Sequence, residues 1–147
     1  MSTLTESNAK PERISFSRLL WVGPVAAVVA AMANLIVFLI AKNLVGIPFV
    51  MPLSGSGSPL EPLPAFMVIV MSIAPALVAA VFLWILGKFA PRPILIFQVI
   101  SLIFLLFSFS GPFSLPVDLP TKLALSVMHV VAAVAIVGVL TTLGRKK

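Results

Sequence analysis

Four long apolar segments constrain the fold of this chain more than any other feature of its sequence. They cover about residues 19–41, 65–87, 93–109 and 121–143, and the only charged residue within them is Lys122, at the start of the fourth. A helix that crosses a hydrocarbon core of about 30 Å needs about 20 apolar residues. In lipid such a helix satisfies its own backbone hydrogen bonds. The sequence therefore predicts an all-α membrane protein with four transmembrane helices in a compact bundle.

The composition excludes most soluble and catalytic classes. Hydrophobic residues make up 61% of the chain and charged residues 10%, whereas soluble domains have about 25% charged residues. The chain has no cysteine, one histidine and four acidic residues. Disulfides, thiolate sites and multi-carboxylate metal centres cannot be assembled from that inventory. We expect no metal, no cofactor and no enzymatic activity.

The placement of Lys and Arg predicts the orientation in the membrane. The net charge is +6, but no basic helix face is interleaved with aromatic residues, so nucleic-acid binding is not expected. Eight of the ten basic residues lie in three places: three in the N-terminal tail, two in the link between the second and third segments, and three in the C-terminal tail. Short loops rich in Lys and Arg face the cytoplasm. We expect a multi-pass plasma-membrane protein with both termini cytoplasmic. Its predicted parts are a cytoplasmic tail (residues 1–17), a transmembrane domain (residues 18–144) and a basic cytoplasmic tail (residues 145–147).

The two tryptophan residues agree with this topology. Trp21 and Trp84 fall at the cytoplasmic ends of their segments, where indole rings favour the interface.

The first segment also has to be compared with a signal peptide. Ala31-Met32-Ala33 is similar to a signal-peptide cleavage site. The apolar run continues through Ala41, whereas a cleaved signal ends its hydrophobic region before the site. We expect the first segment to remain as a helix, with cleavage after residue 33 as the alternative.

The two connections on the outer side are rich in proline. The first, residues 43–64, contains five prolines and the run Ser54-Gly55-Ser56-Gly57-Ser58, so a helix is excluded. Its apolar stretch, residues 46–52, is predicted to be extended and to lie at the membrane surface or over the mouth of the bundle. This connection either has a function of its own or only links the two helices. The second, residues 110–120, begins Ser-Gly and ends Leu-Pro, as residues 56–64 of the first connection do. This similarity suggests two related helix–loop–helix halves.

Small residues mark the helix faces that can approach closely. They recur every four positions in the first and second segments and cluster in the fourth, whereas the third segment is bulky. We predict a tight core of the first, second and fourth helices, with the third facing lipid or, alternatively, a partner protein or second copy. The small and polar positions are Ala26, Ala30 and Asn34; Ser72, Ala76 and Ala80; and Ser126, His129, Ala132, Ala133 and Ala135.

Four polar residues are predicted in the outer half of the bundle, three of them at a similar depth and Ser108 shallower. They form a candidate polar layer or ligand pocket beneath an acidic outer mouth made of Glu61 and Asp118, and they are Asn34, Ser72, Ser108 and His129. In one interpretation His129 ties its helix to Asn34 or a serine through a bond of about 0.6 kcal/mol. In the other, His129 lines a wet pocket that binds a ligand or moves a proton. Gln98 lies nearer the cytoplasm, and Pro75 is predicted to kink the second helix close to the layer.

Four parts of the sequence are similar to known proteins: Asn34, Pro59-Leu60-Glu61-Pro62-Leu63-Pro64, Ser110-Gly111-Pro112-Phe113-Ser114-Leu115-Pro116 and residues 121–133. Through them the chain resembles, from about Arg18 to Gly144, a family of small bacterial four-helix membrane proteins of unknown function. This resemblance implies the four-helix topology and no catalytic role.

Three function classes follow. The first is a structural or accessory subunit of a membrane assembly, whose partners are the lipid bilayer and a membrane protein or second copy. The alternative is a ligand-binding or transport bundle around His129 and Asn34, although small multidrug exporters use a glutamate where this first helix has only Asn34. A membrane-embedded enzyme is least favoured, since thiol chemistry lacks cysteines and Ser126 with His129 is the only candidate dyad.

Overall fold

The computed structural model describes residues 14–55 and 57–145. Within them, four helices are long and apolar enough to cross a membrane: Ser17–Asn43, Ala65–Phe89, Pro93–Ser114 and Leu119–Leu143. The prediction of an all-α membrane protein with four transmembrane helices is therefore confirmed. In order, the elements are α1 (Phe16–Asn43), β1 (Val50–Pro52), β2 (Leu60–Pro62), α2 (Ala65–Phe89), α3 (Pro93–Ser108), α4 (Ser110–Ser114) and α5 (Leu119–Leu143).

Proline sets several helix boundaries. Pro93 opens α3 and Pro120 lies in the first turn of α5, where a missing N–H costs nothing because that donor has no partner within the helix. Two other prolines lie inside helices, Pro24 in α1 and Pro75 in α2. Helix α2 nevertheless continues from Ala65 to Phe89.

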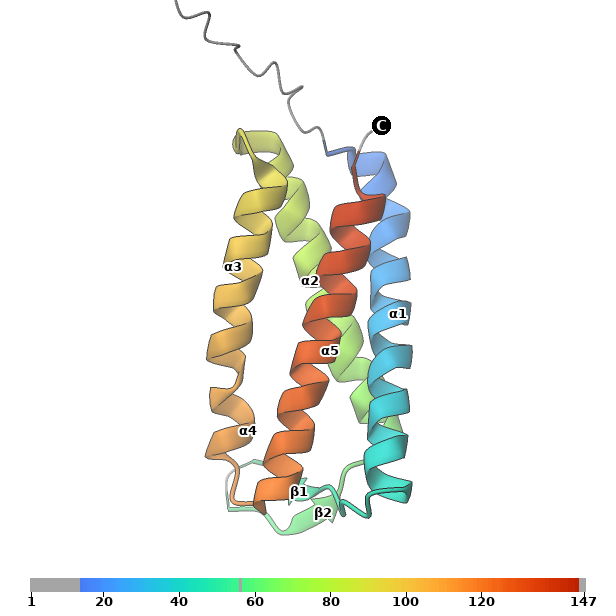
Figure 1. Cartoon of the computed structure of the whole chain (residues 1–147), viewed down its shortest axis with the longest axis vertical. Coiled ribbons are helices and arrows are strands. Elements are labelled where there is room, and N and C mark those ends of the chain that lie inside the picture. Colours follow the sequence, from blue (N-terminus) through green and yellow to red (C-terminus); the bar gives the residue numbers. More distant parts are fainter. Residues whose placement is uncertain (1–13, 56, 146–147) are drawn as a thin grey trace, which may run out of the picture.

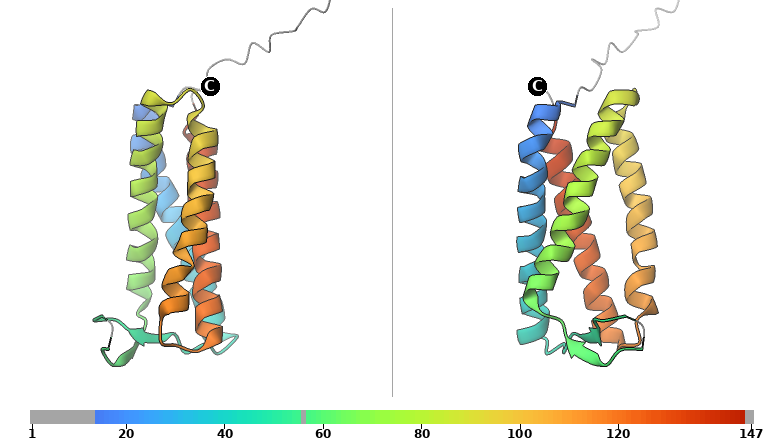
Figure 2. Two further views of the ribbon diagram at one scale, coloured as in Figure 1. Left: turned by 90° about the vertical axis from the view of Figure 1, so that its left-hand side faces the viewer. Right: turned by 180° about the vertical axis from the view of Figure 1, so that it is seen from behind.

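The helices alternate in direction, and α1 lies at the centre of their packing. Helix α1 packs along both α2 and α5, whereas α3 lies at the edge (Figure 1). Of the most apolar stretch of α1, 39% is buried, against 11% for the span that contains α3. Because α2 and α5 cross, α3 lies beside α2 at one end of the bundle and nearer α5 at the other (Figure 2). The predicted core of the first, second and fourth spans is therefore α1, α2 and α5.

The small residues of α1 and α2 lie buried in this core. Ala26, Ala30 and Ala76 are fully buried. A Cβ added at Gly23 would lie 3.0 Å from the Cβ of Ala80, so no larger side chain fits there without movement. Larger side chains from α2, α3 and α5 complete the cluster, namely Leu83, Phe97 and Leu140.

The first outer connection folds back over one end of the bundle. Strands β1 and β2 pair antiparallel, with Met51 opposite Glu61. Phe49 is fully buried, and its ring lies 4.9 Å from that of Phe38 in α1. The Leu63 N–H donates to the Phe49 carbonyl at 2.8 Å. We call residues 47–55 and 57–63 the lid, and the bundle end that it covers the lid end (Figure 1).

Two details of the outer connections differ from the sequence-based expectation. The lid contains a short hairpin. Pro52 and Pro62 are compatible with it because they occupy strand ends, where a missing N–H is tolerated. The second connection begins as helix α4, since the hydroxyls of Ser110 and Ser114 donate to carbonyls three residues earlier and Phe109 keeps a helical conformation. The two similar sequences thus adopt a strand and a helix, so the suggested internal repeat does not extend to these loops.

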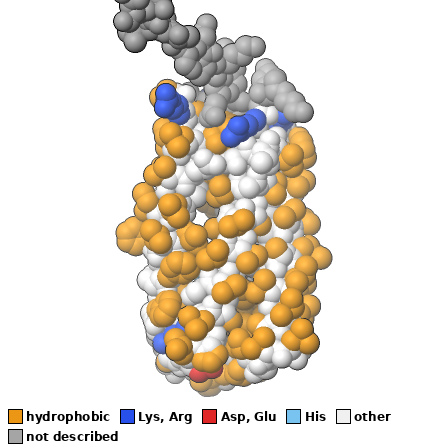
Figure 3. All heavy atoms as spheres, viewed as in Figure 1, with side chains coloured by type: hydrophobic (Ala, Val, Ile, Leu, Met, Phe, Trp, Pro, Cys, Tyr) orange, Lys and Arg blue, Asp and Glu red, His pale blue; other side chains and the backbone are white. Residues whose placement is uncertain are grey.

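Charge separates toward the two ends of the bundle. Four basic residues lie at the helix ends opposite the lid, which we call the basic end, namely Arg18, Lys88, Arg92 and Arg145. Lys42, Glu61, Asp118 and Lys122 lie at the lid end. The surface between the two ends is largely apolar (Figure 3). A band of this kind is typical of a protein surrounded by acyl chains.

Candidate functional site

Two of the four predicted layer residues meet in the interior. The Asn34 side-chain N–H donates to the Ser72 hydroxyl at 3.0 Å, which joins α1 to α2. The Ser72 hydroxyl in turn donates to the Val68 carbonyl, one turn earlier in its own helix, at 2.7 Å. Both side chains are buried, with exposures of 6% and 2%. This chain of bonds is a tie between two helices at membrane depth.

Among the described residues, the side-chain carbonyl oxygen of Asn34 has no hydrogen-bond donor. This Oδ1 atom is buried. A buried carbonyl left without a donor costs about 1–3 kcal/mol. The bond from Asn34 to Ser72 contributes only about 0.6 kcal/mol, the average for a hydrogen bond between membrane helices. The pair therefore aligns α1 with α2 more than it stabilises the bundle.

The other two layer residues bond within their own helices. The Nδ1 atom of His129 donates to the Leu125 carbonyl at 2.8 Å, and the Ser108 hydroxyl donates to the Leu105 carbonyl at 2.7 Å. The expected bond from His129 to Asn34 or a serine is therefore wrong, because a helical side chain reaches the carbonyl one turn back without crossing to another helix. His129 is half-buried.

The two residues of the predicted acidic outer mouth both lie at the lid end of the bundle. Glu61 lies on strand β2 and is exposed. Asp118 precedes α5 at its N-cap position and is exposed, and its side chain makes no capping hydrogen bond. A carboxylate at this position interacts favourably with the helix dipole.

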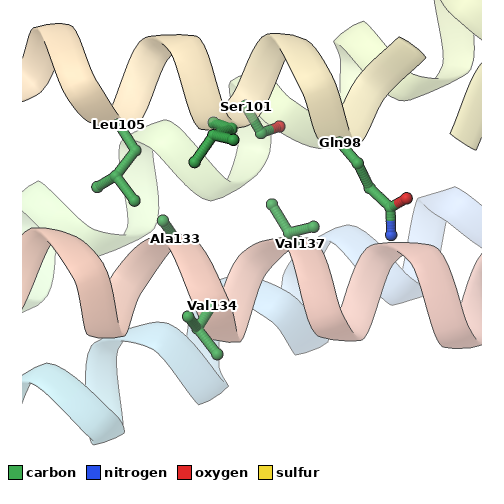
Figure 4. A pocket seen from close by; sticks show the side chains of 7 residues that line it. Gln98, Ser101, Leu105, Ala133, Val134 and Val137 are labelled. Atoms are coloured by element: carbon green, nitrogen blue, oxygen red, sulfur yellow. The ribbon is translucent and has the colours of Figure 1, made fainter. Parts of the chain in front are cut away.

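A pocket lies elsewhere, between α3 and α5. Its volume is about 280 Å³. Two polar side chains of α3 line it together with apolar side chains of both helices, and in Figure 4 the α3 side chains point toward α5. The lining residues are Gln98, Ser101, Leu102, Leu105, Ala133, Val134 and Val137. We call this pocket the α3–α5 groove, and the surface in Figure 3 is hollowed between the two helices.

The sequence carried a signal for the groove that the polar-layer prediction did not use. Gln98, Ser101, Leu102 and Leu105 are spaced by three, one and three residues, which places them on one face of a helix. The groove includes none of the four predicted layer residues. Depth alone grouped those four, whereas the helix face decides which side chains share a cavity.

The comparisons with known proteins address the family. A model of a family of unknown function, DUF6069, matches residues 15–146. The chain belongs to DUF6069. This agrees with the resemblance that the sequence motifs indicated. A comparison of this DUF6069 chain with curated proteins and one with solved structures each found no match.

The described part of this DUF6069 chain offers little acid–base chemistry. In residues 14–55 and 57–145, no three His, Cys, Asp or Glu side chains gather closely enough to hold a metal ion. The Ser126 hydroxyl donates to the Lys122 carbonyl at 2.9 Å, while His129 bonds to Leu125. Each member of the suggested dyad therefore bonds to the backbone of α5. The arrangement suits packing between membrane helices.

Proposed function

We propose that this DUF6069 protein is a structural or accessory subunit of a membrane assembly, without enzymatic activity of its own. The observation that carries the proposal is the position of α3, which covers the bundle on one side and presents large apolar side chains on the other. Phe104 and Phe107 are 73% and 74% exposed. The polar residues at membrane depth bond internally, as Asn34 does with Ser72 and His129 with Leu125. Packing against another membrane protein is the activity that these features support.

Site-specific photocrosslinking tests this partner surface. A photoreactive phenylalanine analogue at position 104 is expected to form an adduct with one protein of defined mass in intact membranes. Phe66 on α2 is the matched control, because its side chain is 64% exposed on another helix. The same analogue at position 66 is expected to react with lipid alone. An adduct of twice 15.6 kDa identifies a second copy as the partner.

The opposite result is equally clear. If positions 104 and 66 give the same lipid adducts and no protein adduct, α3 faces lipid and the accessory role is contradicted. Gel electrophoresis followed by mass spectrometry of the adduct distinguishes the outcomes.

We further propose that the protein lies in the plasma membrane with its basic end in the cytoplasm. Four basic residues at that end support this orientation, namely Arg18, Lys88, Arg92 and Arg145. Lys and Arg in short loops are retained on the cytoplasmic side. The Lys88 ammonium lies 5.3 Å from the centre of the Trp84 ring. Such a pair is typical of a helix end at the membrane surface.

Cysteine labelling measures this orientation, because the chain has no cysteine of its own. In intact cells a membrane-impermeant thiol reagent is expected to label Asp118→Cys fully and Lys88→Cys only after the membrane is permeabilised. Labelling of position 88 in intact cells, with position 118 protected, would reverse the orientation. Labelling of both positions in intact cells would contradict the four-span topology.

A further inference from the structure

We propose that the α3–α5 groove binds one acyl chain of an anionic phospholipid, whose headgroup lies against the basic end of the bundle. The groove opens sideways toward lipid, between two helices that diverge (Figures 2 and 3). This site is separate from the outward face of α3, so it stands independently of the proposed protein partner.

The groove is small and lined mostly by apolar side chains. Its volume is about 280 Å³, near the lower end of ligand pockets, which hold roughly 300–1,000 Å³. Five of its seven lining residues are apolar, namely Leu102, Leu105, Ala133, Val134 and Val137. An apolar groove of this size suits part of one flexible acyl chain.

The polar end of the groove lies toward the headgroups. Gln98 is five residues into α3, or about 7 Å along the helix from Pro93. Side chains on a helix tilt toward its N-terminus, and α3 begins at the basic end. Figure 4 shows the Gln98 amide at that end of the groove, directed toward α5. This is the depth at which the ester groups of a lipid whose chain lies in the groove would be found.

The amide of Gln98 has no protein partner. Within residues 14–55 and 57–145 no side-chain hydrogen bond is made by Gln98 or Ser101. An amide without a partner is costly in hydrocarbon. Lipid ester and phosphate oxygens accept hydrogen bonds, so the Gln98 N–H groups and the Ser101 hydroxyl can donate to them. A purely hydrocarbon environment would leave both side chains unpaired.

Charge selects the headgroup. Arg92 is exposed directly before α3, and Arg145 is exposed just after Gly144, the C-cap residue of α5. Figure 3 shows basic side chains at this end on both sides of the hollow. The acidic residues that the structure describes, Glu61 and Asp118, lie at the opposite end. Basic groups beside a site between membrane helices attract anionic headgroups.

The test measures lipid binding to the full chain. The protein is purified in detergent, depleted of lipid and titrated with phosphatidylglycerol or with phosphatidylcholine of the same acyl chains. Native mass spectrometry gives the number of lipids bound and their dissociation constants. One phosphatidylglycerol is expected to bind at least about fivefold more tightly than phosphatidylcholine, because each Arg near the headgroup contributes about that factor.

Four variants separate the parts of the site. Arg92→Gln is expected to weaken phosphatidylglycerol binding about fivefold and to leave phosphatidylcholine unchanged. Gln98→Leu is expected to weaken both lipids, and Val134→Trp, which fills the groove, to abolish bound lipid. Val78→Trp on α2 is the control, because Val78 and Val134 are 69% and 67% exposed. The control is expected to bind both lipids like the unmodified chain, and melting curves confirm that every variant folds.

Three results would overturn the proposal. Equal affinity of the unmodified chain for the two lipids excludes selection of an anionic headgroup. Loss of affinity in Arg92→Gln with full binding in Val134→Trp places the lipid on surface charge outside the groove. Conversion of a dimer to a monomer by Val134→Trp, with lipid binding unchanged, assigns the groove to a second copy.

Discussion

Replacing Phe49 by alanine is expected to lower the free energy of unfolding by about 3–5 kcal/mol, the usual cost of removing a fully buried phenylalanine. The side chain is 0% exposed and packs against Phe38 beneath the lid. Leu60→Ala in the same hairpin is the control, since Leu60 is 50% exposed and exposed positions contribute little. Titration of the folded protein with a denaturing detergent, followed by circular dichroism, measures both. Equal losses in the two variants would show that the lid does not depend on this anchor.

A glycine at the same position separates packing from backbone strain. Phe49 has a φ of 46°, a left-handed conformation that costs a residue with a Cβ about 1–2 kcal/mol and glycine almost nothing. Phe49→Gly is therefore expected to be no less stable than Phe49→Ala, although it removes one more carbon. If the glycine variant were clearly less stable than the alanine variant, the backbone at position 49 would not be strained in the folded protein.

Enlarging Ala26 to leucine is expected to destabilise the bundle by about 1–3 kcal/mol through overpacking. Ala26 is 0% exposed at the centre of the helix core. Nearby, a Cβ at Gly23 would already lie 3.0 Å from Ala80, so the helices must separate to admit a larger side chain. Alanine and leucine have similar helix propensities, so the loss reports packing.

An exposed alanine on α2 provides the control for this overpacking. Ala74 faces outward, and Ala74→Leu is expected to leave the melting temperature in mild detergent unchanged. If Ala26→Leu melts at the same temperature as Ala74→Leu, the close contact of α1 with α2 is absent in solution.

The helices and their close-packed faces could be predicted because hydrocarbon restricts the choices so strongly. A segment without charges and long enough to cross has to be a helix there. The four-residue spacing of Ala26, Ala30 and Asn34 identifies the face along which α1 meets the Ser72 face of α2. Spacing along a helix needs no knowledge of the partner, so it can be read from sequence.

The lid required information that local sequence does not hold. Its hairpin pairs Val50 with Pro62 across a run rich in Gly and Ser, and each strand has three residues, too few for an alternating pattern to be recognised. What holds it is the burial of Phe49 and Leu63 on the bundle. That burial depends on where α1 and α5 end in space, so it becomes visible only with the fold.

The candidate site was predictable to a similar extent. Counting helical rise placed Asn34 and Ser72 at one depth, and the structure joins them. His129, at a similar count, and the shallower Ser108 were grouped with them, because depth says nothing of which way a side chain faces. The groove beside Gln98 depends on the angle at which α3 diverges from α5. Interhelical angles come from packing across whole faces, which no single motif encodes.

The central place of α1 has a consequence for the order in which the protein is assembled. Helix α1 is synthesised first, yet one of its two flanks is covered by α5, which is synthesised last. At their meeting point a Cβ on Gly144 would lie 3.2 Å from Leu19, and the Arg18 guanidinium donates to the Arg145 carbonyl. Until the ribosome releases α5, that flank of α1 stays open to lipid or to an insertion chaperone. A nascent chain stopped before α5 is therefore a half-closed bundle, because α1 gains its second neighbouring helix only when the last element is made.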